Sequence, residues 1–164
     1  MKHTNAKKIV IGISGGLDST LALLIAVETL RHMNRPLTDI VAVTMPGFAT
    51  TSRTKDNATK MMEALGVTML EKPIALECQI HFKTIEQDPL NHDITYENTQ
   101  ARIRTLILMN LANKLNGIVL GTGDLSELAL GWCTYNGDHM SMYSVNSSIP
   151  KTLIRYLVKW FMDN

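Results

Sequence analysis

Short apolar runs alternate with longer stretches of helical spacing along this chain. The runs at residues 8–13, 39–45, 67–72 and 117–121 predict four buried strands, the third with the weakest pattern. Stretches with helical spacing of apolar residues, or with helix start and stop signals, predict helices at 17–33, 53–65, 74–85, 95–115, 124–130 and from about 150 to 162. This order predicts an α/β fold with a doubly wound parallel sheet, covered by helices on both faces.

Residues that end or begin helices support this assignment. Gly66 suits the left-handed position that follows a helix, and Thr95 is predicted to cap the long helix at 95–115. The apolar residues of that long helix recur at every fourth position, as expected for a helix that packs along one side. They are Ile103, Ile107, Leu111 and Leu115.

The loops that follow strands are where folds of this class hold ligands. The loops at 14–18, 45–54 and 121–139 each follow a predicted strand, and the carboxyl ends of parallel strands meet at one edge of the sheet. Residues 87–93 and the Gly-, Asn- and Ser-rich stretch 131–148 are predicted to be irregular. We therefore expect a ligand site where these loops converge.

Composition limits the partners of the chain. Its 164 residues suggest one domain, and 45% hydrophobic with 19% charged residues is ordinary for a globular protein. The formal charge of +1 provides no overall field for nucleic acid or a membrane. Cys78 and Cys133 lack the spacing of a zinc site or disulfide framework. With a polar N-terminus and no long apolar window, the expected location is the cytoplasm.

The strongest local motif is a glycine-rich loop between a predicted strand and a predicted helix, Ile13-Ser-Gly-Gly-Leu-Asp-Ser-Thr20. Glycines let a ligand approach the backbone, and a helix N-terminus offers N–H groups to an anion. The loop lacks the Gly-Lys-Ser/Thr of a Walker A motif and the spacing of a dinucleotide fingerprint. Because a carboxylate repels a bare phosphate, Asp18 implies a divalent cation between them. The alternative is a tight turn with Asp18 as a helix cap.

The full SGGxDS string in this setting resembles the signature of the PP-loop ATP pyrophosphatases. The resemblance implies that the loop holds the phosphates of ATP. It also implies cleavage of ATP between its α and β phosphates, with adenylation of a substrate oxygen.

A second group of chemically informative residues lies at 121–138 and 146–152. Thr122 directly follows a strand, where its hydroxyl reaches the ligand edge, and Glu127 supplies a second carboxylate for a metal. Lys151 begins a helix, where a cation opposes the helix dipole unless an anion is near. Trp132 and Tyr135 offer surfaces for stacking on an aromatic ring.

Each of these residues also has a purely structural interpretation. Glu127 can be a solvated helix charge, Trp132 a core residue and Lys151 a surface lysine. Cys133 has no adjacent base in the sequence, so a small packing residue is favoured over a nucleophile.

Three segments of the chain resemble the synthetase domain of NAD synthetases. They are Met45-Pro-Gly-Phe-Ala-Thr-Thr51, Tyr96-Glu-Asn-Thr-Gln-Ala-Arg102 and Gly121-Thr-Gly-Asp-Leu-Ser-Glu-Leu-Ala-Leu-Gly-Trp132. The likeness extends from about residue 8 to 160 and is greatest to the glutamine-dependent bacterial form. It implies an adenine nucleotide alpha hydrolase-like fold, a Rossmann-like three-layer sandwich.

The resemblance also implies roles for individual residues. Those expected to bind ATP are Gly12, Ile13, Ser14, Gly15, Gly16, Leu17, Asp18, Ser19, Thr122 and Lys151. Those expected to bind deamido-NAD are Asn98, Arg102, Glu127, Trp132, Cys133, Thr134, Tyr135 and Asp138. Mg²⁺ is expected on Asp18 and Glu127, and catalysis on Asp18, Glu127 and Lys151. Ammonia-dependent relatives carry Lys at the position of Tyr135, so this chain departs from them there.

The implied reaction is the ATP-dependent amidation of deamido-NAD to NAD by ammonia, with an adenylate intermediate. Alternatives are another PP-loop adenylating ligase, such as a GMP synthetase or a tRNA-modifying enzyme, and a non-catalytic nucleotide-binding module. Against the resembled family, 164 residues are short at both ends. We therefore expect residues 1–164 to be a single synthetase domain, a fragment that lacks a glutaminase domain and a C-terminal part and belongs to a homo-oligomer.

Overall fold

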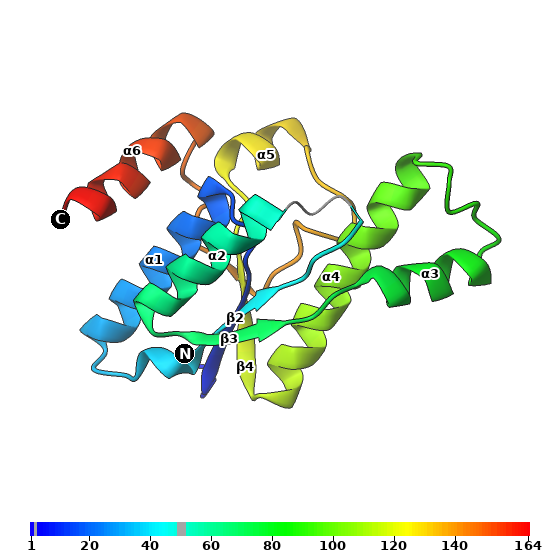
Figure 1. Cartoon of the computed structure of the whole chain (residues 1–164). Coiled ribbons are helices and arrows are strands. Elements are labelled where there is room, and N and C mark those ends of the chain that lie inside the picture. The colour runs from blue at the N-terminus through cyan, green and yellow to red at the C-terminus, as the bar shows by residue number, and fades with distance from the viewer. Residues whose placement is uncertain (2, 49–51) are drawn as a thin grey trace.

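The computed structural model describes residues 1, 3–48 and 52–164 of the chain. Its centre is a sheet of five parallel strands in the order β3-β2-β1-β4-β5. The strands are β1 (Lys8–Gly12), β2 (Ile40–Thr44), β3 (Thr68–Glu71), β4 (Gly117–Gly121) and β5 (Tyr143–Ser144). The sheet with helices on both faces confirms the predicted doubly wound α/β fold (Figure 1).

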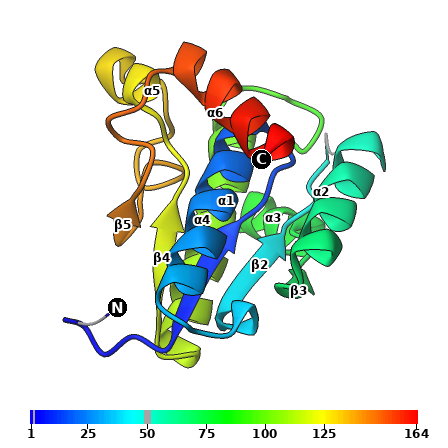
Figure 2. The ribbon, with the colours of Figure 1, turned by 90° about the vertical axis from the view of Figure 1, so that its left-hand side faces the viewer.

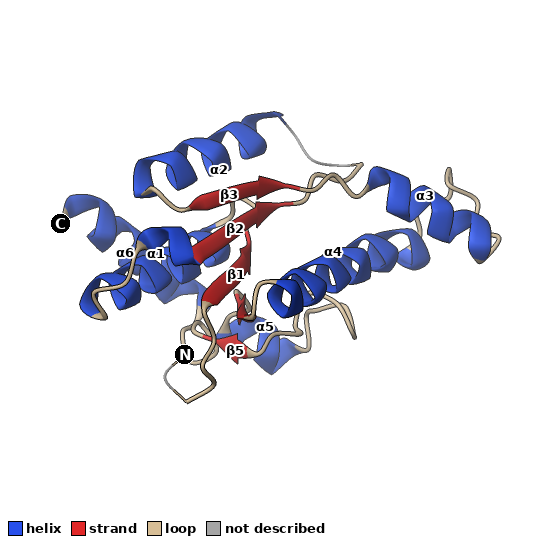
Figure 3. Cartoon of the chain, turned by 90° about the horizontal axis from the view of Figure 1, so that it is seen from below, coloured by secondary structure: helices blue, strands red, loops and turns tan. Residues whose placement is uncertain are grey.

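The helices form two layers on opposite faces of the sheet (Figure 3). On one side, α1 (Leu17–His32) packs on β1 and β2, and α2 (Ser52–Leu65) packs on β2 and β3. On the other side, α4 (Ile94–Lys114) packs on β1 and β4 and also contacts α3 (Ala75–Thr84). The remaining helical segments are the 3-10 turn η1 (Leu37–Asp39), α5 (Leu125–Leu130) and α6 (Lys151–Asp163).

The central strands are apolar throughout because both of their faces are buried. In β1, Ile9 and Ile11 lie in the core under α1, whereas Val10 lies in the core under α4. The same alternation in β2 separates Ile40 and Ala42 from Val41 and Val43. A side-chain period of two residues therefore divides one apolar run between two cores, and each buried Ile or Val contributes roughly 1.5–3 kcal/mol.

The chain order of the strands creates a switch point between β1 and β4. From β1 the chain moves outward through β2 to β3, and then returns to place β4 on the other side of β1. Connections that leave neighbouring strands in opposite directions open a crevice at the carboxyl edge. The glycine-rich loop follows β1 and Thr122 follows β4, so the two segments border this crevice.

Helix α6 does not lie on the sheet but packs against α1 at the edge of the molecule (Figure 2). Ile154 and Val158 of α6 contact Leu21 of α1 in a separate small core. This packing holds the first residue of α6, Lys151, near the glycine-rich loop.

Two details of the sequence interpretation are wrong. The cap of α4 is Asp93, not Thr95, because the Asp93 carboxylate accepts hydrogen bonds from the backbone N–H groups of Thr95 and Tyr96 at 2.9 and 3.0 Å. The backbone hydrogen bond from Tyr96 is the main cause of the lowered pKa of Asp93. The stretch predicted to be irregular contains β5, whose two residues pair with Leu120 and Gly121.

The residues of the predicted apolar stripe of α4 pack in two different cores. Ile103 and Ile107 pack on the core formed with α3, and Leu111 and Leu115 pack on the core beneath the sheet. Within the described residues, no helix combines the length and the hydropathy needed to cross a membrane.

Candidate functional site

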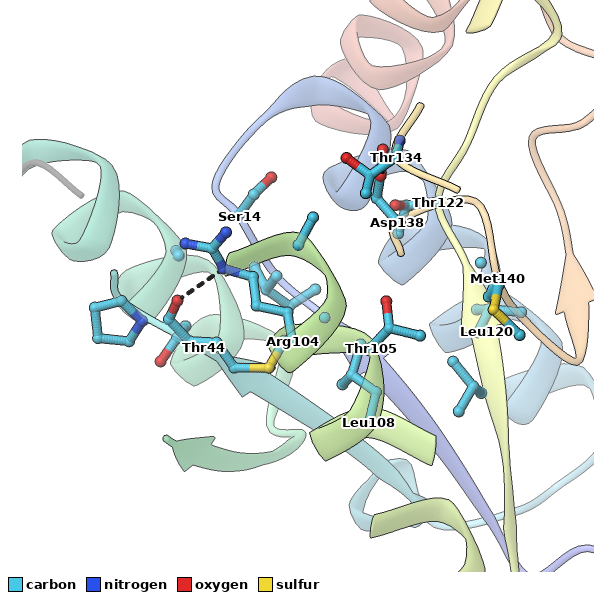
Figure 4. A pocket seen from close by; sticks show the side chains of 18 of the residues that line it. Ser14, Thr44, Arg104, Thr105, Leu108, Leu120, Thr122, Thr134, Asp138 and Met140 are labelled. Carbon is cyan, nitrogen blue, oxygen red and sulfur yellow. Dashed lines mark hydrogen bonds between the residues drawn. The ribbon is translucent and has the colours of Figure 1, made fainter. Parts of the chain in front are cut away.

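The carboxyl ends of β1, β2 and β4 border a cavity of about 590 Å³ (Figure 4). Its lining includes residues 12–14, 44–46 and 119–122 from the strand ends, with further side chains from α4. Thr134, Asp138 and Met140 close another side. The predicted convergence of the loops after these strands is therefore confirmed for the described residues, whereas Ala49, Thr50 and Thr51 of the second loop lie outside them.

The glycine-rich loop enters α1 with its first amides uncapped by any side chain. Gly15 has φ +82°, which favours glycine, and Gly16 is the N-cap residue without a side-chain hydrogen bond. Ser14 Oγ lies 3.2 Å from Ser19 Oγ and accepts a hydrogen bond from the Gly16 N–H. Leu17 and Asp18 are the first residues of α1. Because Asp18 does not cap the helix, the structural interpretation of this carboxylate is wrong.

The carboxylate of Asp18 instead belongs to an acidic cluster with Asp124 and Glu127. One ligand oxygen from each of the three residues lies within 4.8 Å of the other two. Asp124 and Glu127 form a capping box at the start of α5, with Asp124 Oδ1 accepting from Glu127 N and Glu127 Oε2 accepting from Asp124 N. The capping box fixes two carboxylates at one helix end, and the switch point brings Asp18 to them.

Lys151 supplies the positive charge of this cluster. Its Nζ forms an ion pair with Asp18 and lies 3.3 Å from Asp124 Oδ2 and 3.7 Å from Glu127 Oε1. Burial acts to lower the pKa of Lys151, but the hydrogen bond from its ammonium to Asp18 and the nearby carboxylates of Asp124 and Glu127 raise it above its usual value. A cation at a helix start is unfavourable unless an anion is near, and for Lys151 the nearby anions are these carboxylates.

Two oxygens in the cluster are suited to a divalent cation. Asp18 Oδ1 and Asp124 Oδ2 are buried and accept no hydrogen bond, and the Asp124 side chain is 0% exposed. Unsatisfied carboxylate oxygens are costly to bury, and hard cations such as Mg²⁺ take oxygen ligands of this kind. The residues present therefore fit a metal ion. Sequence reasoning missed Asp124, although the Asp-x-x-Glu spacing of a capping box was visible.

The segment after α5 is tied to the first half of α4. Thr134 Oγ1 donates to Asn98 Oδ1 at 2.8 Å, and Arg102 Nε donates to the Tyr135 carbonyl at 3.1 Å. Asp138 Oδ1 accepts from the Thr134 N–H at 2.8 Å. These five residues, predicted from resemblance to form one substrate site, are thus brought together. Thr134 and Asp138 line the cavity.

The aromatic residues of this segment point to solvent. Trp132 is 77% exposed and Tyr135 is 75% exposed, so the interpretation of Trp132 as a core residue is wrong. Cys133 is an exposed free thiol, and its interpretation as a packing residue is also wrong. These three side chains lie beside the cavity lining rather than in it, where they are available to a ligand that extends outward.

Asn146 is a further residue that sequence reasoning did not assign. It is fully buried, and its Nδ2 donates to the carbonyls of Asp18 and Thr122 at 3.0 and 3.1 Å. One side chain therefore joins the start of α1 to the end of β4, the two segments on either side of the crevice. A polar residue in an irregular stretch gave no sequence signal for this bridge.

A parallel sheet with its switch point at a glycine-rich loop is a Rossmann-like, doubly wound α/β fold. The family model described as NAD synthase matches residues 1–162. The chain belongs to this family.

Among curated relatives, the chain is 51% identical over 158 residues to the glutamine-dependent NAD(+) synthetase of Mycobacterium leprae. The match covers 93% of this chain and 23% of that protein. The structure of the glutamine-dependent NAD+ synthetase from Acinetobacter baumannii in complex with ADP has a TM-score of 0.89 and 32% identity, over 97% of this chain and 30% of that one.

An NH3-dependent NAD synthetase from Campylobacter jejuni, in complex with nitrate, has a TM-score of 0.84 and 27% identity. That match covers 98% of this chain and 66% of the other. The chain thus spans about a quarter of the length of the glutamine-dependent curated relatives and about two thirds of this NH3-dependent protein.

Proposed function

We propose that this chain carries the site at which an NAD synthetase uses ATP to convert deamido-NAD and ammonia to NAD. The observation that carries the proposal is the convergence of an uncapped glycine-rich loop with the Asp18–Asp124–Glu127 cluster and Lys151 at one cavity. Simple nucleotide binding does not require three carboxylates beside an anion-binding loop. An ADP complex of a relative with 32% identity supports ATP as the nucleotide.

In the proposed reaction, a carboxylate oxygen of deamido-NAD attacks the α-phosphorus of ATP. The bond to the β-phosphate oxygen breaks, pyrophosphate leaves, and an acyl adenylate forms. Ammonia then attacks the activated carbonyl carbon and loses a proton, and AMP leaves with the electron pair of the acyl–oxygen bond. No covalent bond to the protein is needed, so the residues act by positioning and by neutralising charge.

The residues of the chain divide these tasks. The uncapped amides at the start of α1, with Ser14 and Ser19, bind phosphate oxygens, and Lys151 neutralises the departing pyrophosphate. Thr122 borders the same crevice and donates its hydroxyl to the nucleotide. Asn98, Arg102, Trp132 to Tyr135 and Asp138 form the surface for deamido-NAD.

Asp18, Glu127 and Asp124 are the residues that would hold Mg²⁺. A bound divalent cation supplies charge neutralisation to the phosphates that face these carboxylates. The protein's own contribution is to keep the three carboxylates together: the capping box fixes two of them, and Asn146 fixes the backbone that carries the third.

The test is to mix the protein with ATP, Mg²⁺, deamido-NAD and ammonium and to follow NAD and AMP by chromatography. Equal amounts of the two products are expected. Without ammonium, deamido-NAD should still drive exchange of labelled pyrophosphate into ATP. Exchange driven by a different acid would favour another PP-loop ligase, and binding of ATP with neither exchange nor AMP would favour a nucleotide-binding module.

The names of the glutamine-dependent relatives state that these proteins depend on glutamine. We extend the proposal to a synthetase unit at residues 1–164 that receives ammonia from a glutaminase domain and works within a homo-oligomer. Sedimentation and a comparison of glutamine with ammonium as nitrogen source test these two points.

A further inference from the structure

Arg104 is a cation of the cavity wall to which neither the motifs nor the comparisons assign a role. It lies on α4, and its side chain reaches into the cavity toward Ser14 and Thr44 (Figure 4). Its Nε donates to the backbone carbonyl of Met45 at 3.2 Å. Arg104 thus faces the crevice from the helix layer opposite α1.

The guanidinium of Arg104 has no directly paired carboxylate. Within the described part of the chain, no Asp or Glu oxygen lies within 4.0 Å of its guanidinium, and its hydrogen-bond acceptor is a neutral carbonyl. Glu97 lines the same cavity but forms no ion pair with it. Burial lowers the pKa of Arg104, and electrostatic interactions with Cys78 and Glu97 oppose this effect. Because a guanidinium does not lose its proton in proteins, the positive charge stays, with no directly paired carboxylate among the described residues.

The chain leaves space around this guanidinium at Gly47. A Cβ atom at Gly47 would lie 2.7 Å from Arg104 Nη2 and 2.6 Å from Gln100 Oε1. Any larger residue at position 47 would therefore displace the guanidinium. Of its five N–H donors, the Nε–H is used by Met45, and the Nη groups are the ones that remain for a ligand.

Lys151 provides an instructive contrast within the same site. Its ammonium contacts three carboxylates, whereas the guanidinium of Arg104 contacts none among the described residues. We infer that Arg104 binds an oxyanion of a bound substrate, either a phosphate of ATP or the carboxylate or diphosphate of the dinucleotide. Resting on the proposed function, this inference adds a binding residue on the α4 side of the cavity.

Titration calorimetry with four ligands tests the inference and separates the three oxyanions. ATP is compared with adenosine, which lacks phosphates, and deamido-NAD with NAD, which lacks the carboxylate. Arg104→Gln should weaken one anionic ligand by at least about tenfold, or about 1.4 kcal/mol, and adenosine by less than about twofold. Lys114→Gln, which removes an exposed charge from the end of the same helix, is the matched control and should change none of the four.

The pattern of losses identifies the bound group. A loss confined to ATP indicates its phosphates, a loss for deamido-NAD but not NAD indicates the carboxylate, and a loss for both dinucleotides indicates the diphosphate. Unchanged affinities, or a loss for adenosine equal to that for ATP, would overturn the inference. If the unaltered protein bound neither ATP nor deamido-NAD, the proposed function itself would fall.

Folding is checked by thermal denaturation of each variant. If Arg104→Gln does not fold, Arg104→Lys replaces it, because lysine keeps the charge and loses the planar fork of donors. That variant should weaken the same ligand by at least about threefold, and the criteria for rejection are unchanged.

Discussion

The ammonium nitrogen of Lys151 lies 3.3 Å from Oδ2 of Asp124, a carboxylate whose side chain is 0% exposed, while the lysine itself is 51% exposed. The first residue of α6 thereby compensates a buried charge at the start of α5. The same carboxylate oxygen is one of two in the cluster that accept no hydrogen bond. The oxygens that would hold a divalent cation under the proposed function are thus the ones that the ammonium of Lys151 faces.

Replacing Lys151 should make competition between its ammonium and a divalent cation measurable. Lys151→Met leaves Asp124 without its counter-charge, so the free energy of unfolding should fall by about 1–2 kcal/mol, less than for a fully buried pair because Lys151 is half exposed. Without nucleotide, Mn²⁺ should bind the variant more tightly than the unaltered protein, measured by the loss of free Mn²⁺ signal in electron paramagnetic resonance. Weaker Mn²⁺ binding in the variant would contradict the competition. Lys159→Met, at an exposed position of the same helix, is the control.

Asp18→Asn should abolish adenylation and leave the fold intact. The amide cannot provide the charge that a metal requires, and Asp18 does not cap α1, so the helix loses no capping bond. Pyrophosphate exchange should fall by at least about 100-fold, with little change in the melting temperature. Glu28→Gln, which removes an exposed carboxylate from the same helix, should exchange normally. Normal exchange in Asp18→Asn would exclude a role in metal binding.

Trp132→Ala should weaken deamido-NAD more than ATP. The indole is 77% exposed, so its loss leaves no core cavity and the melting temperature should not change. Stacking of an aromatic side chain on a base contributes roughly 1–3 kcal/mol, which corresponds to at least about a fivefold loss of affinity in calorimetry. Trp160→Ala, another exposed tryptophan, controls for general loss of aromatic surface. Equal losses for both ligands would mean that Trp132 acts only through the shape of its loop.

The free energy of unfolding should depend on pH through the carboxylate of Asp39, which lies at the amino edge of the sheet. Hydrogen bonds from Lys8, opposed by burial and aided by Arg35, lower the pKa of Asp39. A carboxylate with a lowered pKa in the folded state stabilises the fold above its unfolded pKa of about 3.9, and this contribution is lost as the pH falls through the folded value.

Asp39→Asn should therefore be about 1–3 kcal/mol less stable than the unaltered protein at pH 7. The difference should shrink as the pH falls below about 3.9, in urea denaturation followed by circular dichroism. Asp56→Asn, an exposed carboxylate of α2, should show no such pH-dependent difference. If the difference in the free energy of unfolding stayed constant as the pH fell below about 3.9, the charge of Asp39 would be ruled out as its cause.

Much of the fold follows from local chemistry. The ends of β1 to β4 agree with the predicted ranges within two residues, because a short apolar run rich in β-branched residues and bounded by turn residues is typical of a strand buried on both faces. Two local details were not predicted. The cap of α4 is Asp93 rather than Thr95, and β5, with two residues, is too short to carry a pattern.

The sequence by itself determined the order of the first four strands and of the helices, the glycine-rich loop and the family to which the motifs point. These depend on periodicity and on backbone freedom, which are properties of neighbouring residues. The tertiary structure decided that Asp18, Asp124 and Glu127 share one cluster and that Trp132 is exposed. It also decided that, among the described residues, Lys151 and not Arg104 forms ion pairs with carboxylates. Charge compensation and burial depend on residues more than a hundred positions apart, such as Asp18 and Asn146, and only the packing of α6 and β4 around β1 and α1 brings them within hydrogen-bond distance.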